Sequence, residues 1–417
     1  MRILQVSHSD SPGERFNGYD LMKELNKFED VSCSMIVSKN TYAESVGILN
    51  KKNQVLQNRM VALGKNLGVE NLISPWVKMI VETQEWKNAD VVHYQLLRGF
   101  PISAYEMNRL FEGKKAVWTI HNSWPFTGGC IHPLQCEKWK NGGCHDCARQ
   151  DAESVVNSSF ASEEYQYKKK CYKMSDFPII VTTDYMKDQI SQSILSKHPV
   201  YKIPFGLKKE EFESGDINGF CKKYGIHKYK FTIGFRNNNG KLKGTKYIFE
   251  ALRLLIDTVG KNEEDVQKIQ IISVGGKEMP DDISRRVETH SLEWLNGSDI
   301  GSFYEKCDIF LMPSLAESFG LMSIEAMAHG CVVITFKSTA PAEIIGAPKY
   351  GVAVEYGNST AITEEILHLL YNDGARERLS ARGKEYVKEM YSFENYVKAH
   401  MMLYEKMIQG SYTNQRK

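Results

Sequence analysis

The chain has 417 residues, of which 42% are hydrophobic and 25% charged, and its net charge is +2. This length exceeds the usual size of one hydrophobic core, so we expect two domains of roughly 200 residues each. A net charge so close to zero gives no reason to expect a nucleic-acid-binding protein. No apolar run approaches the roughly 20 residues that span a bilayer, and the first ten residues do not resemble a signal peptide. We therefore expect a cytoplasmic protein.

Short apolar segments that predict β-strands alternate with helical stretches along the first half of the chain. The predicted strands cover residues 2–8, 31–38, 89–97, 115–122, 177–183 and 200–206. Several are apolar at consecutive positions, as is typical of parallel strands buried on both faces.

Between the second and third of these strands, residues 50–66 form a basic amphipathic pattern. Val55, Leu56, Met60 and Leu63 fall on about one face of the predicted helix. That face is either a core stripe of a surface helix or a contact with a membrane surface or a lipid acceptor. The sequence leaves both interpretations open.

A cysteine-rich loop follows the strand predicted over 115–122. Its eighteen residues contain four of the nine cysteines of the chain, namely Cys130, Cys136, Cys144 and Cys147. The last two form a C-x2-C pair, and four thiolates complete a structural zinc site of the Cys₄ type. Reduced thiols without a metal and disulfides are the alternatives, although a reducing cytoplasm disfavours disulfides. We predict a structural zinc that holds the loop after His121 in a fixed conformation.

The second half repeats the alternation of strands and helices. Its predicted strands cover residues 230–236, 269–276, 308–314, 331–336 and 350–355, with helices over 246–259 and 321–329 between them. Two such series predict an α/β protein with two Rossmann-like, doubly wound domains. The periodicity breaks near 204–212, so the expected domains are residues 1–205 and 206–391. The amphipathic helix within 392–417 is expected to pack back on the first domain.

Two glutamates, Glu317 and Glu325, stand eight residues apart around a strand-to-helix connection. The first lies in the loop that leaves a predicted strand, and the second lies inside the following helix. Free backbone N–H groups at the start of that helix suit a bound phosphate. The carboxylates can accept hydrogen bonds from sugar or ribose hydroxyls. Ligands of open α/β sheets bind at this end of the strands, so the segment predicts a binding site.

Cations stand in a second strand-to-helix connection. Arg236 ends a predicted strand, and Lys241 and Lys243 follow in a loop rich in glycine and asparagine. Two cations at strand and loop ends can neutralise a diphosphate leaving group. Lys241 is also explained as a solvated surface charge.

These motifs carry a resemblance to a known family. The E-x7-E pattern of Glu317 and Glu325, the "FR…KG" pattern of Arg236, Lys243 and Gly244, and "IPFGL" at the domain junction resemble the GT-B retaining glycosyltransferases of family 4. The resemblance implies two Rossmann-like domains that face each other across a cleft. It also implies transfer of a hexosyl or related sugar, with retention, from a nucleotide-sugar donor held mainly by the second domain.

The resemblance also assigns roles to residues of the second half. It implies that Arg236 and Lys243 contact the donor diphosphate, that Glu325 binds the ribose hydroxyls and that Glu317 binds the transferred sugar. It further implies that four residues contact the sugar and the phosphate through the loop and helix start, namely Ser318, Phe319, Gly320 and Leu321.

In the first half, His121 of "WTIHN" matches a family histidine that lies near the donor sugar. It would donate a hydrogen bond to the sugar or steady developing charge; a structural strand-end histidine is the alternative. The sequence leaves open whether His93 lines the same cleft. Gly18 stands where the family has a glycine-rich loop. One glycine instead of the commoner pair still allows a phosphate to approach the backbone.

The resemblance implies a same-face displacement in which the leaving phosphate helps to take the acceptor's proton. The chain has no evident catalytic triad and no DxD motif, so we predict catalysis without a metal. The cysteine-rich loop resembles that of bacterial transferases for capsule, exopolysaccharide and lipopolysaccharide. The expected partners are a nucleotide-sugar donor and a glycan or lipid-linked glycan acceptor, with no nucleic acid. A peripheral contact with the cytoplasmic face of the membrane is left open.

Two other functions fit parts of the sequence. One is a nucleotide-sugar epimerase or hydrolase on the same fold, and the other is a metal-stabilised binding protein. The arrangement of Glu317 and Glu325 favours transfer over the first. The neutral net charge argues against nucleic-acid binding by the cysteine-rich unit.

Overall fold

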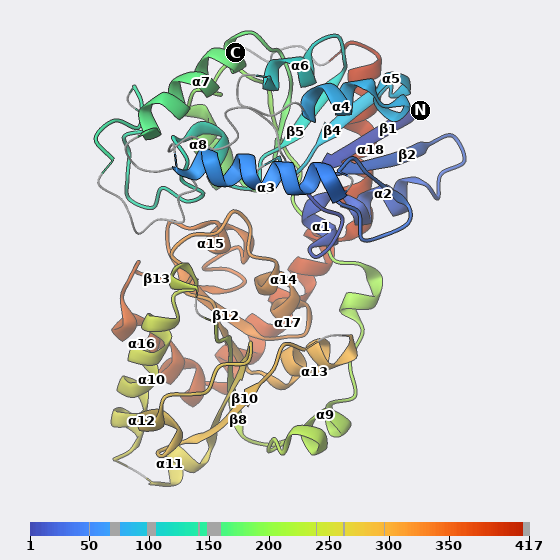
Figure 1. Ribbon diagram of the computed structural model, residues 1–417. Coiled ribbons are helices and arrows are strands. Elements are labelled where there is room, and N and C mark those ends of the chain that lie inside the picture. Colours follow the sequence, from blue (N-terminus) through green and yellow to red (C-terminus); the bar gives the residue numbers. More distant parts are fainter. Residues whose placement is uncertain are drawn as a thin grey trace. The chain divides into compact units, whose positions relative to one another are not determined.

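The structure is a computed structural model that describes residues 1–49, 51–66, 76–97, 106–140, 142–147, 160–238, 240–261, 263–295 and 297–411 (Figure 1). The chain divides into two compact units. One comprises Met1–Ile203 and Val397–Lys417, and the other comprises Pro204–Tyr396. Each unit is built on its own parallel sheet, so the predicted α/β class with two Rossmann-like folds is confirmed.

The first unit contains a parallel seven-stranded sheet in the order β3-β2-β1-β4-β5-β6-β7. Its strands are β1 (Arg2–Ser7), β2 (Ser32–Val37), β3 (Ser45–Gly47), β4 (Val91–Tyr94), β5 (Ala116–Thr119), β6 (Ile179–Val181) and β7 (Val200–Lys202). The connecting helices are α1 (Glu14–Asn17), α2 (Tyr19–Leu25), α3 (Lys51–Asn66), α4 (Trp76–Glu82), α5 (Gln84–Asn88), α6 (Met107–Phe111), η1 (Trp124–Phe126), α7 (Ala161–Lys173) and α8 (Asp184–Ser191).

The second unit contains a parallel six-stranded sheet in the order β10-β9-β8-β11-β12-β13. Its strands are β8 (Phe231–Arg236), β9 (Ile269–Val274), β10 (Glu288–Leu292), β11 (Ile309–Leu311), β12 (Val332–Phe336) and β13 (Val352–Val354). Its helices are η3 (Lys209–Phe212), α9 (Ile217–Tyr224), η4 (Lys241–Lys243), α10 (Thr245–Val259), α11 (Glu263–Gln267), α12 (Asp281–Ser284), α13 (Ser298–Lys306), α14 (Leu321–Ala328), α15 (Ala340–Ile344), α16 (Ser359–Tyr371) and α17 (Asp373–Met390), followed by α18 (Phe393–Ile408).

The two strand orders place a topological switch point in each sheet. In the first sheet the chain runs outward from β1 in one direction and resumes with β4 on the other side, and β8 and β11 have the same relation in the second sheet. Ligands of doubly wound sheets bind where such neighbouring strands end. Arg236 ends β8, and the loop after β11 contains Glu317. Chain topology therefore brings the two predicted donor-binding segments to one edge.

Every predicted strand is present, but two strands were not predicted. The edge strand β3 has three residues, of which two are exposed, and the edge strand β10 is only partly buried over most of its length. Neither segment carries the apolar run by which the other strands were recognised. Among the described helices, none combines the length and the apolar composition that a bilayer span requires.

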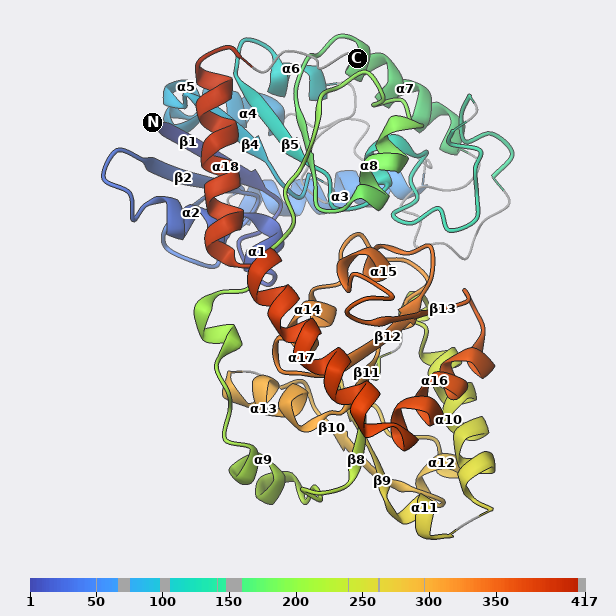
Figure 2. The ribbon, with the colours of Figure 1, turned by 180° about the vertical axis from the view of Figure 1, so that it is seen from behind.

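Helix α18 belongs to both units. At its start, Ser392 pairs with Leu207 and the ring of Tyr396 lies 5.8 Å from that of Phe205, all within the second unit. From Val397 onward the helix lies along the first sheet, as Figure 2 shows in red. At its end the Lys115 ammonium donates to the Ile408 carbonyl over 2.5 Å.

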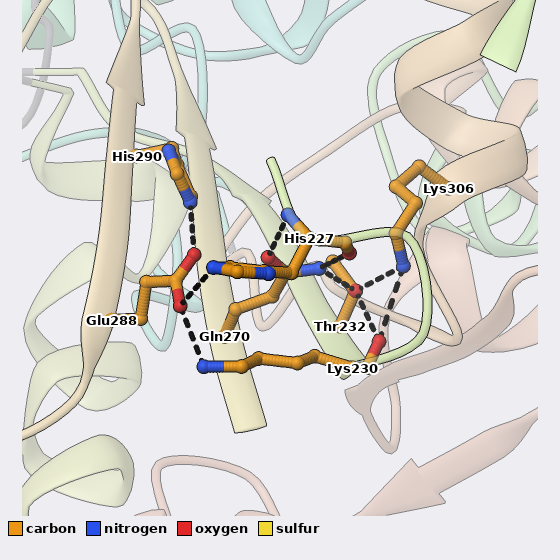
Figure 3. A network of polar contacts seen from close by, with 7 residues as sticks. All are labelled: His227, Lys230, Thr232, Gln270, Glu288, His290 and Lys306. Carbon is orange, nitrogen blue, oxygen red and sulfur yellow. Dashed lines mark hydrogen bonds and ion pairs between the residues drawn. The ribbon is translucent and has the colours of Figure 1, made fainter. Parts of the chain in front are cut away.

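A network of polar side chains ties together the amino-terminal edge of the second sheet (Figure 3). The buried Gln270 amide donates to the His227 carbonyl (2.6 Å) and to the Thr232 hydroxyl (2.8 Å), and the Lys306 ammonium donates to the same hydroxyl (2.6 Å). On the neighbouring strand, Glu288 accepts from Lys230 at 2.6 Å. These bonds satisfy polar groups at the amino-terminal ends of the strands, opposite the carboxyl ends where ligands of such sheets bind.

Candidate functional site

Arg236 presents its guanidinium at the carboxyl end of β8. The guanidinium lies over the Trp294 ring, 4.7 Å from its centroid, and this indole is 47% exposed. The Nε atom of Arg236 is buried and has no hydrogen-bond partner among the residues that the structure describes. Stacking holds the plane of the guanidinium, which suits it to bind a phosphate from one side. Trp294 was not singled out from the sequence, because an isolated tryptophan in a loop carries no pattern.

Lys243 and Glu317 come together. The Lys243 ammonium donates to the Glu317 carboxylate, and both side chains are largely shielded from solvent. Gly244, with φ +74°, makes this possible, because a Cβ at that position would lie 1.9 Å from the Pro313 carbonyl oxygen. The tight glycine contact therefore holds the cation loop against the loop that carries Glu317.

The segment Ser318–Leu321 leads into α14. Phe319 is fully buried, and its ring packs edge-on against Phe205 at 5.3 Å and Tyr391 at 5.8 Å. Only its backbone remains for a ligand, as the family resemblance implies. Gly320 adopts φ +99° and precedes the first residue of α14, Leu321. The Ser318 side chain is buried.

Glu325 is held by a tyrosine that the sequence did not single out. The Tyr304 hydroxyl on α13 donates to Glu325 Oε2 over 2.8 Å. Tyr304 is 1% exposed, and burial followed by the neighbouring Glu325 charge raises its pKa well above the ordinary value. The hydroxyl therefore stays protonated and fixes one carboxylate oxygen of Glu325. A tyrosine inside an amphipathic helix is usually core, so only the fold could have revealed it.

The same edge contains further buried polar atoms without partners. Thr245 Oγ1 and Ser314 Oγ are buried and have no hydrogen-bond partner within the described parts of the chain. Leaving such a group unpaired costs about 1–3 kcal/mol unless a ligand or water pairs with it. Together with Arg236, they mark the carboxyl edge of β8 and β11 as a site prepared for a polar ligand.

In the first unit, Gly18 lies between α1 and α2 with φ +89°. A Cβ at this position would lie 2.9 Å from Gln5 Oε1 and 3.0 Å from Gln95 Cγ. The glycine is therefore required for packing, and its approach to a phosphate stays a prediction. The neighbouring Asn17 is fully buried, and its Nδ2 has no partner among the described residues.

His121 follows β5 and is 9% exposed. Its Nε2 lies 3.2 Å from Gln95 Oε1, and its ring meets the Phe16 ring edge-on at 6.0 Å. Burial, followed by the charge of His400, lowers the pKa of His121 to about 3, so the imidazole is neutral. His93 is fully buried inside the unit and hydrogen-bonded through both nitrogens. It is thus an interior residue.

The cysteine-rich loop is held by α7. The Lys168 ammonium is completely buried, pairs with Glu164 at 3.2 Å, and donates to the carbonyls of Trp124 (2.9 Å) and Thr127 (3.1 Å). Gly128 packs so closely on α7 that a Cβ would lie 2.1 Å from the Ala161 carbonyl oxygen. The loop after His121 is therefore held in place by side-chain and backbone contacts with α7.

All four loop cysteines are of intermediate burial and are not joined in disulfides. The Gly128 N–H donates to Cys144 Sγ over 3.1 Å, and burial raises the pKa of that thiol, with smaller contributions from the Cys136 and Cys147 charges. Among the described residues, no three potential ligands gather closely enough to hold a metal ion. The zinc site therefore stays a prediction.

Comparison with known proteins agrees with this geometry. Residues 218–386 match the family described as glycosyl transferases group 1. An uncharacterised glycosyltransferase of Methanocaldococcus jannaschii is 25% identical over 338 residues, which cover 78% of this chain and 87% of that protein. The capsular polysaccharide biosynthesis glycosyltransferase CapM of Staphylococcus aureus is 27% identical over 228 residues, which cover 51% of this chain and 57% of CapM.

Two solved structures show the same fold. HepE of Anabaena, in complex with UDP, superposes with a TM-score of 0.65 at 13% identity and covers 97% of this chain and all of its own. WaaG, a glycosyltransferase involved in lipopolysaccharide biosynthesis, superposes with a TM-score of 0.63 at 12% identity, covering 96% of this chain and 99% of WaaG. The chain therefore has the GT-B fold, and its second unit contains the segment that matches the group 1 glycosyltransferases.

Proposed function

We propose that the protein transfers a hexosyl or related sugar, with retention, from a nucleoside-diphosphate sugar to a surface polysaccharide or lipid-linked oligosaccharide. The names of its relatives support this acceptor class, since they include a capsular polysaccharide transferase and an O-antigen chain mannosyltransferase of Escherichia coli. HepE has been solved with UDP and with UDP-glucose, which supports a nucleotide-sugar donor.

One observation carries the proposal. The carboxyl edge of the second sheet combines two cations, Arg236 and Lys243, with two carboxylates, Glu317 and Glu325, and with buried polar atoms that lack partners. Cations suit a diphosphate, and carboxylates suit the hydroxyls of ribose and sugar. When the donor binds, its phosphate would compete with Glu317 for Lys243, which would release Glu317 to bind the transferred sugar.

Chemistry at such a site depends on positioning and charge stabilisation. In the proposed same-face displacement, the bond from the anomeric carbon to the diphosphate breaks while the acceptor oxygen forms its bond. The acceptor proton passes to the leaving phosphate oxygen, whose negative charge Arg236 and Lys243 stabilise. We propose that no catalytic metal is needed. Restoration of chelator-inhibited turnover by Mg²⁺ or Mn²⁺ would contradict this.

The test is nucleotide release from a panel of nucleoside-diphosphate sugars, with and without glycan acceptors. Acceptor-dependent release, with the product's anomeric configuration read by NMR, supports retaining transfer. Release without an acceptor would indicate a hydrolase, and isomerised donor would indicate an epimerase. Inactivity with every donor and acceptor would leave a binding protein as the better explanation.

We also propose that α3 rests on the cytoplasmic face of an anionic membrane. Val55, Leu56 and Leu63 are 53%, 49% and 58% exposed, so they do not form the core stripe that was one interpretation of the sequence. The helix sequence contains three lysines and one arginine and no acidic residue. Exposed apolar side chains among basic ones suit a lipid surface with negative head groups.

Sedimentation with vesicles tests this contact. The protein should bind phosphatidylglycerol vesicles, and changing Val55, Leu56 and Leu63 to serine should weaken binding roughly tenfold or more. The control changes two exposed apolar residues of the second unit, Leu254 and Met390, to serine. Equal binding by the α3 variant, or no binding by the unaltered protein, would refute the contact.

We further propose a structural zinc bound by Cys130, Cys136, Cys144 and Cys147. Its support is the spacing of the four cysteines in the sequence. Elemental analysis of protein purified without chelator should find one zinc per chain, and Cys144→Ser should remove it. Protein that retains its fold and contains no metal would exclude the site.

A further inference from the structure

Inside the first unit, a row of buried polar side chains runs from His121 to α18. Its members lie at the ends of three neighbouring strands and on the helix, and each is at most 3% exposed: Gln5, His93, Gln95, Thr119 and Tyr404. The face of a sheet that a helix covers is usually apolar, because unpaired polar groups there are costly. A fully paired row on this face therefore points to a task beyond packing. We call these five residues the buried polar row.

The strand pairing explains why these side chains meet. Gln5 on β1 is the direct neighbour of His93 on β4, and Gln95 stands two residues further along on the same face. From the helix, Tyr404 reaches both strands. Its hydroxyl lies 2.6 Å from His93 Nδ1 and accepts from Gln5 Nε2 over 3.3 Å. The other ring nitrogen of His93 lies 2.6 Å from the Thr119 hydroxyl.

The directions of these bonds depend on one another. The Gln5 amide donates to the Tyr404 hydroxyl, whose oxygen also lies 2.6 Å from His93 Nδ1. The Thr119 hydroxyl lies 2.6 Å from His93 Nε2, so His93 is bonded on both sides. At the other end, the Gln95 amide nitrogen donates to Gln5 Oε1 over 3.0 Å, which leaves Gln95 Oε1 as the atom that faces His121.

An amide oxygen only accepts hydrogen bonds. Because Gln95 Oε1 lies 3.2 Å from His121 Nε2, that nitrogen must carry the proton. In a neutral imidazole the other nitrogen, Nδ1, then has the lone pair. Gly18 completes the arrangement, since only a glycine leaves room for the Gln5 and Gln95 amides beside the loop after β1.

We propose that Gln95, oriented by Gln5, His93 and Tyr404, is the positioning residue that holds His121 in its Nε2–H tautomer. The ring would then meet the sugar as a hydrogen-bond acceptor through Nδ1, not as a donor. This second statement rests on the proposed function and on the family resemblance, which implies that His121 lies near the donor sugar. It also gives α18 a part in positioning His121, because Tyr404 contacts both Gln5 and His93.

The titratable groups that face His121 and the row include His93 on β4, both His400 and Tyr404 on α18, and the buried Cys33 thiol on β2, which contacts Gln5. The His400 ring stacks on His93 with centroids 5.5 Å apart. Burial is the main cause that lowers the pKa of His93 and of His121, so both stay neutral through the range of an activity assay. A fixed tautomer is therefore not disturbed by protonation near neutral pH.

The first test reads the tautomer directly and needs no substrate. In protein labelled with ¹⁵N-histidine, long-range ¹H–¹⁵N correlation should show His121 protonated at Nε2, with His121→Gln used for the assignment. Gln95→Leu should shift the ring toward a mixture of tautomers. An Nδ1–H tautomer in the unaltered protein would overturn the proposal, because the row would then run in the opposite direction.

The second test is kinetic. Tyr404→Phe should lower kcat about tenfold and leave the KM for the donor within about twofold, since the hydroxyl that bonds both Gln5 and His93 is lost. Tyr94→Phe is the matched control, because its hydroxyl is also buried and donates over 2.6 Å to the Leu110 carbonyl outside the row. Equal kcat losses for the two variants would indicate a purely structural role and refute the coupling.

Two comparisons separate this proposal from the proposed function. If the unaltered enzyme shows no acceptor-dependent transfer, the function fails, and the NMR result alone decides whether the row fixes the tautomer. If transfer occurs but His121→Ala keeps full kcat, the catalytic part of this proposal is refuted while the function stands.

Gln95→Glu, which keeps an accepting oxygen toward His121, should retain the Nε2 proton and more activity than Gln95→Leu.

Discussion

The two edges of the second sheet use similar polar side chains for opposite purposes. At the amino edge, Gln270, Thr232 and Lys306 pair with one another and with backbone carbonyls (Figure 3). At the carboxyl edge, Arg236 Nε and Thr245 Oγ1 are buried without a partner in the described regions. Paired groups stabilise the fold. Buried unpaired groups lower the free energy of unfolding, and this loss is recovered when a bound ligand pairs with them. The comparison supports the proposal that the donor binds at the carboxyl edge.

The largest expected effect is at the carboxyl edge. Glu325→Ala should weaken binding of the donor nucleotide roughly 100-fold, about 2.7 kcal/mol, because hydrogen bonds from the ribose hydroxyls to a carboxylate are lost. Titration calorimetry with the donor nucleotide measures this. Glu288→Ala makes the same change at the amino edge and should leave the affinity unaltered. Equal affinities for the two variants would remove the distinction between the edges.

The converse prediction concerns the amino edge. Gln270→Leu should lower the free energy of unfolding by about 2 kcal/mol, because it removes the bonds to His227 and Thr232 and leaves buried groups unpaired. Donor affinity of the folded variant should not change. Denaturant unfolding and calorimetry check the two statements. A variant of normal stability with weakened donor binding would reverse the assignment of the edges.

A smaller effect is expected from Tyr304→Phe, which removes the hydroxyl that holds Glu325. Donor affinity should fall about tenfold, as expected for a lost hydrogen bond to a charged group. Tyr224→Phe provides a matched control, since its hydroxyl donates to Asp299 over 2.9 Å elsewhere in the same unit. If both variants bind the donor like the unaltered protein, Tyr304 does not position Glu325.

The smallest effect depends on pH. Burial by itself raises the pKa of Glu288, but hydrogen bonds from Lys230 and His290 outweigh it and hold the pKa below the ordinary value. The pairing therefore stabilises the fold above the carboxyl's unfolded pKa and is lost as the pH falls through its lowered folded pKa.

Glu288→Gln should accordingly cost about 1 kcal/mol of unfolding free energy at pH 7 and progressively less as the pH falls below about 4.5. Unfolding curves across this range measure the difference. Asp281→Asn, in a fully solvated pair with Arg285, should change little at any pH. A difference for Glu288→Gln that does not shrink as the pH falls would contradict the pairing.

The strands of the two units show what a sequence reveals and what it does not. The apolar strands were recognised because burial on both faces leaves a continuous run, and the edge strands β3 and β10 were missed because they are only partly buried. The exposed face of α3 was left open, since amphipathicity does not say whether the apolar face meets a core or solvent. The exposure of Val55 and Leu63 came only from the fold.

Local patterns of burial and spacing were enough to predict the α/β class, the family motifs and the residues that end strands at the switch point. The groups that contact these residues were visible only in the fold: Tyr304 contacts Glu325, Trp294 contacts Arg236, and Gln95 contacts His121. Each of these contacts joins segments that lie far enough apart to share no local pattern, so the sequence offers no signal for it. The fold supplies the partner, and the partner fixes the orientation on which the chemistry depends.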